Sequence, residues 1–365
     1  MNKERQAPDY ILIVATIALL AIGLIMVYSA SEAWATYRFD DSLFFAKRQF
    51  FFGSVGVLLM FFISRVDYWT WRTYSKVLLI ICFVLLVLVL IPGVGLVRGG
   101  ARSWLGIGAF SIQPSEFMKI AMIIFLANFL AVNQKRIVLF RKGLLPALGF
   151  VMVAFAMIML QPDLGTGTVM VGTCVAMIFI AGARVKHFMG LFLIGVAGFV
   201  VLIISAPYRI KRITSFLDPW ADPMESGFQI IQSLLAIGPG GLLGMGLGES
   251  RQKYFYLPEP QTDFIFAILA EELGFMGGVF VLLLFAVIFW RGVRIALGAP
   301  DLFGSFLAAG IVTMIVIQVM INIGVVTGLM PVTGITLPLL SYGGSSLTLM
   351  LMSIGILINI SRHNR

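Results

Sequence analysis

Four carboxylates stand in one short stretch of an otherwise apolar sequence, YLPEPQTDFIFAILAEELG, residues 256–274, and three of them, Asp263, Glu271 and Glu272, lie at or inside its apolar run. Asp263 follows the rigid Pro-Glu-Pro of residues 258–260 and precedes an apolar run, which predicts a position near the start of a helix. Thr262 or Asp263 could cap that helix, because the helix N-terminus stabilises an anion. Alternatively, the Asp263 carboxylate could accept a proton at the edge of the apolar region. The residues alone leave both roles open.

Glu271 and Glu272 lie inside the apolar run itself. On a continuous helix Glu271 lies about 12 Å below Asp263, and an ionised carboxylate that faces lipid at this depth is costly. Because successive residues turn by about 100°, at most one of the two glutamates faces the cavity of Asp263. We expect the other to meet a basic or hydroxyl partner on a neighbouring helix, so structural pairing is the alternative to a role in chemistry.

Two further polar blocks interrupt apolar runs. In QPSEFMK, residues 113–119, Glu116 and Lys119 are three apart on one helix face. Either they neutralise each other locally, or one of them reaches across the bundle. In QPDLGTGT, residues 161–168, Asp163 stands at a predicted helix end, with glycines that let backbones approach closely. The three blocks are expected to aim carboxylates at one level of the membrane.

Positive charge also occurs where the orientation rule for membrane proteins does not expect it. Arg102 lies in GGARSW, and Arg209, Lys211 and Arg212 lie in YRIKRI. These side chains could contact lipid headgroups or nearby acids, or they could clamp an anionic substrate such as a phosphate or pyrophosphate. Together with a proton-accepting carboxylate, they suggest chemistry on an anionic lipid of the outer leaflet.

The composition places the chain in a lipid bilayer. Of its 365 residues, 60% are hydrophobic and 12% are charged, and the mean hydropathy is +1.01. The two cysteines and two histidines supply no disulfide framework, histidine-based zinc centre or Ser-His-Asp triad. The net charge is +9, but the basic residues are scattered singly or in pairs, which does not indicate nucleic-acid binding.

Ten apolar runs are long enough to cross about 30 Å of hydrocarbon. They predict an all-α polytopic membrane protein with a single integral-membrane domain over residues 1–365. The first run exceeds the apolar region of a signal peptide, so we expect a spanning helix there. The predicted spans are residues 10–30, 48–64, 77–93, 116–133, 144–161, 166–182, 188–206, 263–290, 303–327 and 342–360.

The charge distribution predicts the orientation. With the N-terminus in the cytoplasm, short cytoplasmic segments hold 15 of the 26 basic residues, and an even number of spans returns the C-terminus to the cytoplasm. The large outer loop, residues 207–262, lies between the seventh and eighth spans and is long enough to suggest a function. Its glycine-rich segment, residues 237–250, lacks the context of a dinucleotide fingerprint, so a re-entrant or surface-lying segment is expected.

The blocks together resemble the SEDS family, which includes RodA, FtsW and the stage V sporulation protein E. The resemblance is strongest toward the FtsW and sporulation branch of Gram-positive spore formers. It covers nearly the whole chain, and the blocks that carry it are GGARSWLGIGAFSIQPSEFMK, QPDLGTGT, LPEPQTDFIFAILAEELG and NIGVVTGLMPVTGITLPLLSYGGSS.

The resemblance implies a peptidoglycan glycosyltransferase that polymerises lipid II at the outer face of the cell membrane. A class B penicillin-binding transpeptidase and other divisome or sporulation membrane proteins are the implied partners, at the division septum or forespore membrane. The essential aspartate of the family corresponds to Asp263, and its polar pair in the fourth helix corresponds to Glu116 and Lys119. A lipid II flippase or transporter is the alternative, against which we find no convincing inverted repeat; a scaffold that only recruits the transpeptidase is a third possibility.

The implied reaction joins an acceptor sugar hydroxyl to a donor whose leaving group is undecaprenyl pyrophosphate, with inversion to a β-1,4 linkage. Asp263 is expected to be the base, or to hold a divalent cation, Mg²⁺ or Mn²⁺, beside the pyrophosphate. No tightly bound cofactor is expected. The candidate substrate-binding or supporting residues are Glu116, Lys119, Arg102, Asp163, Arg209, Lys211, Arg212, Glu259, Gln261, Thr262, Glu271, Ser341, Gly343, Gly344 and Ser345.

Overall fold

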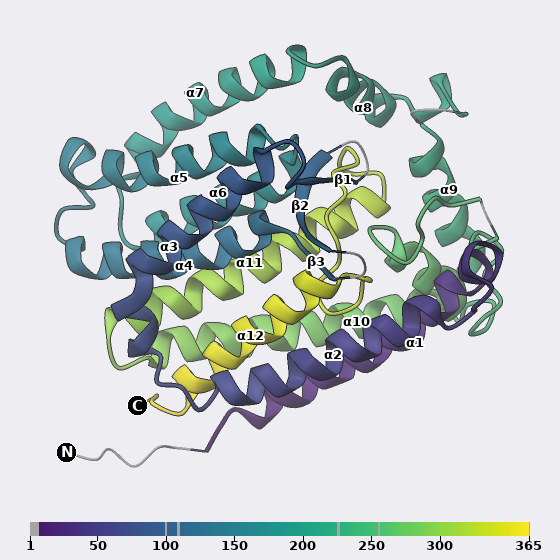
Figure 1. The fold of residues 1–365 in the computed structure, drawn as a ribbon, viewed down its shortest axis with the longest axis horizontal. Coiled ribbons are helices and arrows are strands. Elements are labelled where there is room, and N and C mark those ends of the chain that lie inside the picture. Colours follow the sequence, from purple (N-terminus) through teal and green to yellow (C-terminus); the bar gives the residue numbers. More distant parts are fainter. Residues whose placement is uncertain (1–6, 99–100, 108–109, 225–226, 255, 365) are drawn as a thin grey trace.

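The computed structural model describes residues 7–98, 101–107, 110–224, 227–254 and 256–364, which form a bundle of long helices (Figure 1). The α-helices are α1 (Tyr10–Phe39), α2 (Phe44–Ile63), α3 (Trp69–Leu90), α4 (Pro114–Asn133), α5 (Leu145–Met159), α6 (Leu164–Ile180), α7 (Val185–Ile204), α8 (Pro207–Leu217), α9 (Phe228–Ile237), α10 (Ile265–Gly298), α11 (Leu302–Val326) and α12 (Gly344–Ser361). A π-helical turn, Phe140–Leu144, precedes α5, and 3-10 turns occupy Pro219–Ala221 and Gly238–Gly240.

Each predicted span corresponds to one helix, and the prediction of a polytopic helical protein is confirmed. Within the described residues, eight helices are long and apolar enough to cross a membrane, while α6 and the segment Val185–Gly198 of α7 are shorter apolar helices. The long connection between α7 and α10 contains α8 and α9. α1 continues past its predicted end at residue 30 because the segment SEAWATYRF is rich in helix-forming residues.

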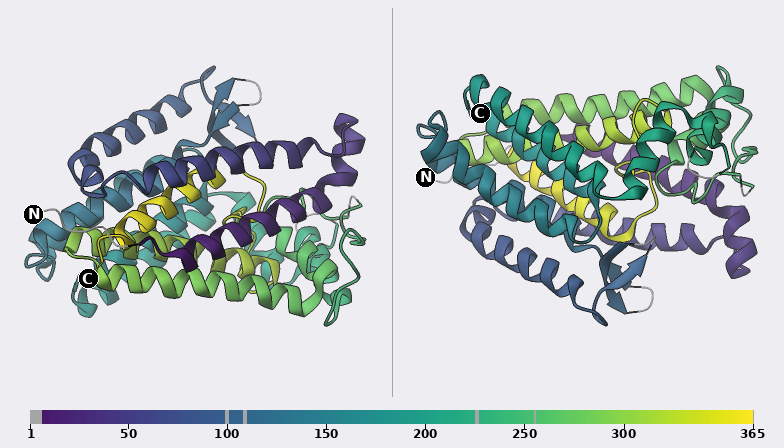
Figure 2. Two further views of the ribbon diagram at one scale, coloured as in Figure 1. Left: turned by 90° about the horizontal axis from the view of Figure 1, so that it is seen from below. Right: turned by 90° about the horizontal axis from the view of Figure 1, so that it is seen from above.

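The two ends of the bundle differ. Figures 1 and 2 show the start of α1 and the end of α12 at one end, which we call the terminal end. There the Asp9 N–H donates to the Ser361 hydroxyl (3.2 Å), and the Asp9 carboxylate pairs with Arg291 of α10 (2.7 Å). The opposite, loop-rich end carries the strands, α8, α9 and the glycine-rich segment. Between the ends α11 contacts α4, α6 and α10, while α2 packs on α12 and α1 on α10.

The helix α10 is broken at Gly274, whose backbone angles (φ 67°, ψ −166°) are not helical. A break inside an apolar helix leaves backbone groups that need partners, because lipid offers none. The glycine-rich segment supplies these partners. Met245 and Gly246 N–H groups donate to the carbonyls of Glu271 and Glu272 (both 3.0 Å). The carbonyls of Gly241 and Leu242 in turn accept from the Phe275 and Met276 N–H groups (2.9 and 3.1 Å).

Glycine is required on both sides of this contact. A Cβ atom on Gly244 would lie 2.1 Å from the Glu272 carbonyl oxygen, and one on Gly274 would lie 2.3 Å from the Gly244 nitrogen. The backbones therefore touch directly, with no room for a side chain between them. The sequence predicted one continuous helix over residues 263–290, and this is wrong at Gly274, where the helix is broken. The break was not predicted because the segment ELGF contains no proline to indicate it.

A small antiparallel sheet was not expected from the sequence. The strands β1 (Leu96–Arg98), β2 (Ala101–Ile107) and β3 (Phe110–Ile112) pair in the order β1-β2-β3. The strand β2 packs on α3 and α4, and β3 contacts α12. Both views in Figure 2 show the strands at the loop-rich end, opposite the termini. Otherwise the described residues are helical or irregular, as an all-α protein requires.

The break in α10 leads to a test of stability. We expect Gly274→Ala to lower the apparent melting temperature of the purified protein strongly, because the backbone conformation favours glycine and a Cβ meets backbone atoms. The strain alone is worth about 1–3 kcal/mol. The matched control is Gly190→Ala in α7, where a Cβ meets nothing within 4 Å. Equal melting temperatures for the two variants would show that the contact with the glycine-rich segment contributes nothing to stability.

Candidate active site

Asp263 lies at the loop-rich end, two residues before α10, and is partly exposed. The Thr262 hydroxyl donates to Asp263 Oδ1 (2.9 Å) and to the carbonyl of Glu259 (2.8 Å). Glu259 itself is exposed and has a positive φ of 45°. The expected alternative, a side-chain cap on the helix, is wrong: the N-cap of α10 is Phe264, without a side-chain capping hydrogen bond. The carboxylate therefore stands in an irregular turn beyond the helix.

Two segments distant in sequence fix the backbone beside Asp263. The side-chain amide of Asn322, on α11, donates to the carbonyls of Asp263 (2.7 Å) and Ile335 (2.8 Å). The Tyr342 N–H donates to the carbonyl of Gln261 (2.8 Å), whose side chain is buried. The turn that precedes α10 and the segment that precedes α12 are thus held together at the aspartate.

The segment before α12 is itself anchored to α2. The buried Ser341 hydroxyl accepts from the Leu337 N–H (2.8 Å), and the Ser341 carbonyl accepts from the Gln49 side-chain amide (3.0 Å). The Gly343 N–H donates back to Gln49 Oε1 (3.4 Å). A Cβ on Gly344 would lie 2.8 Å from the Phe52 ring, so this glycine lets α12 approach α2. Ser345, the last of the candidates in this segment, is partly exposed at the start of α12. Ser341 forms a hydrogen bond within the turn, and Gly343 forms one with Gln49.

Glu271 and Glu272 are buried and both accept from hydroxyl groups. Glu271, 1% exposed, accepts from the Ser250 hydroxyl and from the Arg251 N–H (2.9 Å), both in the large loop. Glu272, 0% exposed, accepts at Oε1 from the Ser29 hydroxyl of α1. Both glutamates are therefore paired with donors on neighbouring segments, which is the structural role that the sequence left as an alternative. They hold the loop and α1 against α10. Of Asp263, Glu271 and Glu272, Asp263 is the one that is partly exposed.

Lys253, which was not among the candidate residues from the sequence, lies in the large loop near Glu271. Its side chain is fully buried, its Nζ donates to the Gly248 carbonyl (2.6 Å), and Glu32 of α1 lies 3.7 Å away. The Lys253 N–H also donates to the Ser250 hydroxyl (3.3 Å) that binds Glu271. This lysine links the loop to α1 at the loop-rich end. A single lysine in a polar loop ordinarily indicates exposure, so the sequence carried no signal for its burial.

The block on α4 and the block before α6 meet each other. Glu116 and Lys119 pair at 2.7 Å, both largely buried, so they neutralise each other locally. Asp163 caps α6 by accepting from the Thr166 N–H (3.1 Å). Its other oxygen accepts from the Gln113 amide (2.8 Å) and the Ser115 hydroxyl (3.0 Å) at the start of α4. Asp163 therefore joins the loop-rich ends of α4 and α6.

The basic candidates lie on separate elements. Arg102, partly exposed, is on β2, where it pairs with Val97 of β1. Lys211 is exposed on α8, which contacts α7 and the 3-10 turn Pro219–Ala221. The side chains of Arg209 and Arg212, on the same helix, lie outside the described residues. Their role as an anion clamp stays a prediction.

A divalent cation can be tested against the residues around Asp263. Within the described part of the chain, no group of three or more His, Cys, Asp or Glu side chains could hold a metal ion. Mg²⁺ is commonly held by one or two carboxylates together with substrate phosphates. The single Asp263 carboxylate, with the Thr262 hydroxyl beside it, fits a cation that arrives with a diphosphate and does not fit a permanent metal centre.

Fold and site together define a polytopic helical membrane protein with a partly exposed aspartate at its loop-rich end, above buried and paired carboxylates. The family model described as "Cell cycle protein", FtsW/RodA/SpoVE, matches residues 10–365. The chain belongs to this family, as the sequence blocks predicted.

Similar proteins cover the chain almost completely. Stage V sporulation protein E of Bacillus subtilis (strain 168) is 72% identical over 100% of both chains. The "probable peptidoglycan glycosyltransferase FtsW" of Geobacter metallireducens is 43% identical over 98% of this chain and 96% of its own. A solved chain from a peptidoglycan synthase complex that coordinates polymerization and crosslinking has a TM-score of 0.81 at 32% identity, over 98% of each chain. The rod shape-determining protein RodA of Thermus thermophilus has a TM-score of 0.73 at 29% identity, with the same coverage.

The amide of Asn322 gives a test of how the site is held. We expect Asn322→Asp to lower the apparent melting temperature, because it replaces a donor to two carbonyls by a buried acceptor of the same size. The loss corresponds to about 1–3 kcal/mol. The control is Asn133→Asp at the end of α4, where a partly exposed amide donates to one helical carbonyl. A melting temperature as high as that of the control would contradict the proposed clamp.

The burial of Lys253 gives a second test. We expect Lys253→Met to destabilise the protein and to make the large loop more accessible to proteases, because the Gly248 carbonyl and Glu32 lose their partner. The control is Lys47→Met, which breaks an exposed ion pair with Asp41 at 2.8 Å and is expected to cost about 0–1 kcal/mol. The Lys47–Asp41 pair is shorter than the Lys253–Glu32 contact, but it should contribute less to stability because it is exposed to water. Identical digestion patterns for the two variants would refute a structural role for Lys253.

Proposed function

We propose that this protein is a peptidoglycan glycosyltransferase that polymerises lipid II into β-1,4 glycan strands. The names of its relatives support this proposal: FtsW proteins 43% identical over nearly the whole chain are named probable peptidoglycan glycosyltransferases. The similarity to a chain of a peptidoglycan synthase complex supports it further. The structural observation that carries the assignment to a residue is the contrast between a partly exposed Asp263 and the buried, hydrogen-bonded Glu271 and Glu272.

Asp263 acts as the general base of this reaction. The acceptor sugar hydroxyl attacks the anomeric carbon of the donor, and its proton passes to the Asp263 carboxylate. The bond between the anomeric carbon and the diphosphate oxygen breaks on the opposite face, and undecaprenyl pyrophosphate leaves with the bonding electron pair. One displacement inverts the α-linked donor to a β linkage, so no second carboxylate is needed as a nucleophile. The buried positions of Glu271 and Glu272 agree with this requirement.

The surrounding residues orient the base and bind charge. The Thr262 hydroxyl and the Asn322 amide fix the position of the aspartate, and the first of them touches its carboxylate directly. Arg102 and Lys211 are the described basic side chains proposed to bind the diphosphate. A divalent cation bound with the substrate would be held by Asp263 and would neutralise charge on the leaving group.

The orientation in the membrane belongs to the same proposal. The loop-rich end faces the exterior, where lipid II is polymerised, and both termini lie in the cytoplasm. The basic residues at the terminal end support this orientation through the positive-inside rule. A class B penicillin-binding transpeptidase is the proposed partner in the division septum or forespore membrane, in line with the solved synthase complex that coordinates polymerization and crosslinking.

Purified protein supplied with fluorescent lipid II tests the catalytic role. We expect Asp263→Ala and Asp263→Asn to lower glycan synthesis by about 10²–10⁴-fold, the usual contribution of a general base. The control is Asp41→Asn, which removes an exposed carboxylate at the same end of the bundle. Melting curves verify that all variants fold.

The outcomes separate the competing functions. Full polymerisation activity in the Asp263→Asn variant would show that the Asp263 carboxylate is not the general base. Translocation of lipid II in liposomes without polymer would indicate a flippase instead. If Asp263 holds a cation, a conservative Asp263→Glu variant should need more Mg²⁺ or Mn²⁺ for half-maximal rate. An unchanged cation requirement assigns the residue to proton transfer alone.

A further inference from the structure

An apolar groove of about 450 Å³ lies between α3 and α5, and Asp263 is not among the residues that line it. Its walls are Phe83 on α3 and Pro146, Gly149, Phe150 and Val153 on α5. Gly149 faces open space in this groove, because a Cβ there would meet nothing within 4 Å. Phe150 is held against Phe125 of α4 in an edge-to-face contact with ring centroids 4.9 Å apart. The neighbouring helix therefore supports one wall of the groove.

The terminal ends of both walls are strongly basic. Arg72 and Lys76 lie on α3, and Arg141 and Lys142 lie in the π-helical turn that leads into α5. All four side chains are exposed. No acidic residue occurs in α3 or anywhere between Glu116 and Asp163 in the sequence. The acid nearest to α3 in sequence, Asp67, lies 3.7 Å from His363.

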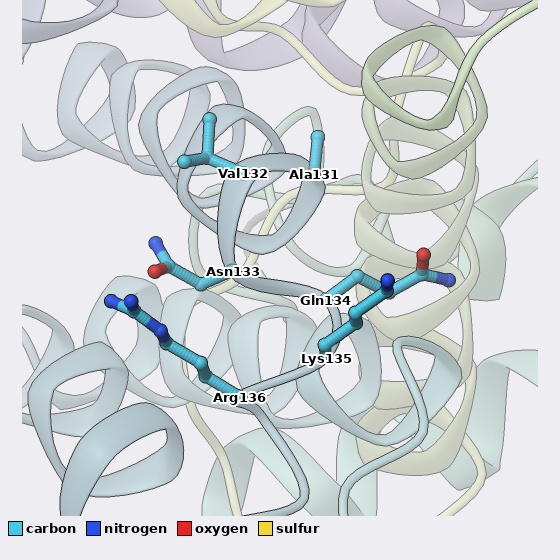
Figure 3. Close-up of a pocket in the computed structure, with 6 residues that line it drawn as sticks. All are labelled: Ala131, Val132, Asn133, Gln134, Lys135 and Arg136. Carbon is cyan, nitrogen blue, oxygen red and sulfur yellow. The ribbon is translucent and has the colours of Figure 1, made fainter.

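The turn between α4 and α5 adds more positive charge. A shallow cavity of about 400 Å³ is lined by residues 131–136, including Lys135 and Arg136. Figure 3 shows the side chains of Asn133 and Arg136 on one side of this turn and those of Gln134 and Lys135 on the other. Arg72 is oriented toward α4, because its Nε donates to Asn128 Oδ1 (3.2 Å).

On both walls, a basic residue precedes a groove-lining residue by the same number of positions. Lys76 precedes Phe83 by seven residues on α3, and Lys142 precedes Gly149 by seven residues on the chain entering α5. Seven helical residues span roughly 10 Å. Each wall thus places a cation at the membrane interface and an apolar surface about two turns deeper. This arrangement matches a phosphate headgroup followed by an acyl chain.

We propose that the groove and the basic residues beside it bind one anionic phospholipid. The headgroup phosphate contacts basic side chains of Arg72, Lys76, Arg141 and Lys142, and an acyl chain lies along Phe83 and over Gly149. The positive-inside rule explains the basic residues but not the groove between them. Charge complementarity favours an anionic lipid over an apolar partner helix, because basic pockets between membrane helices recognise such headgroups.

Native mass spectrometry of the full-length protein, reconstituted in mixed phosphatidylglycerol and phosphatidylcholine, tests the proposal. We expect one phosphatidylglycerol molecule to be retained preferentially. The double variant Arg141→Gln/Lys142→Gln should weaken its retention by about tenfold or more. The matched control is Arg184→Gln/Lys186→Gln, which removes the same charge from two exposed positions at the start of α7. If both double variants lose phosphatidylglycerol to the same extent, the lipid is held by general attraction to basic surfaces, and the proposal is overturned.

A second pair of variants tests the groove. Gly149→Leu fills open space and should displace the acyl chain, whereas Gly190→Leu fills open space on α7 and should retain the lipid. Val153→Phe, at an exposed wall position, replaces Gly149→Leu if that variant fails to fold. Lipid retention unchanged in the groove variants would overturn the proposal. Loss of a co-purified single-span protein with unchanged lipid would assign the groove to a partner helix instead.

Discussion

The site depends on one constraint: backbone polar groups inside a bilayer need protein partners. The broken helix α10 meets this constraint by pairing with the glycine-rich segment on both sides of Gly274. The pairing fixes the large loop against the bundle without any side chain at the contact. Ser250, Arg251 and Lys253 can then reach their partners, because the preceding segment is already in place. The loop is therefore a part of the membrane domain and not an appendage to it.

The same constraint separates the roles of the carboxylates. Glu271 and Glu272 are deep enough that they need hydrogen-bond donors, and hydroxyl groups from the loop and from α1 supply them. A carboxylate that is enclosed in this way cannot meet a substrate. Asp263 lies before the start of the helix and is partly exposed, so a molecule outside the protein can reach it. Depth in the membrane decides which of three similar side chains is available for chemistry.

Much of the fold and part of the site could be predicted from the sequence. The ten apolar runs each predicted a helix, and within the described residues eight of these helices are long and apolar enough to cross a membrane. Glu116, Lys119 and Glu271 were noticeable because charges inside such runs are costly. Asn322 offered the same kind of signal, as a polar residue in an apolar helix. The break at Gly274 could not be predicted, because a glycine within an apolar run is compatible with a continuous helix. The burial of Lys253 depends on contacts with α1 more than 200 residues away in the sequence, which no local pattern records.

The interruption of α10 also has a mechanical consequence. Its first part, Ile265–Leu273, is bonded through two carbonyls to the large loop, and the turn before it is bonded through Asn322 to α11. The second part, Phe275–Gly298, is connected to the first through a single non-helical residue. A displacement of the loop from outside the membrane is thus transmitted to Asp263 over a short and stiff path. The longer part is bonded to the same loop through the Phe275 and Met276 N–H groups, so the loop links the two parts of the broken helix to each other and to the turn that carries Asp263.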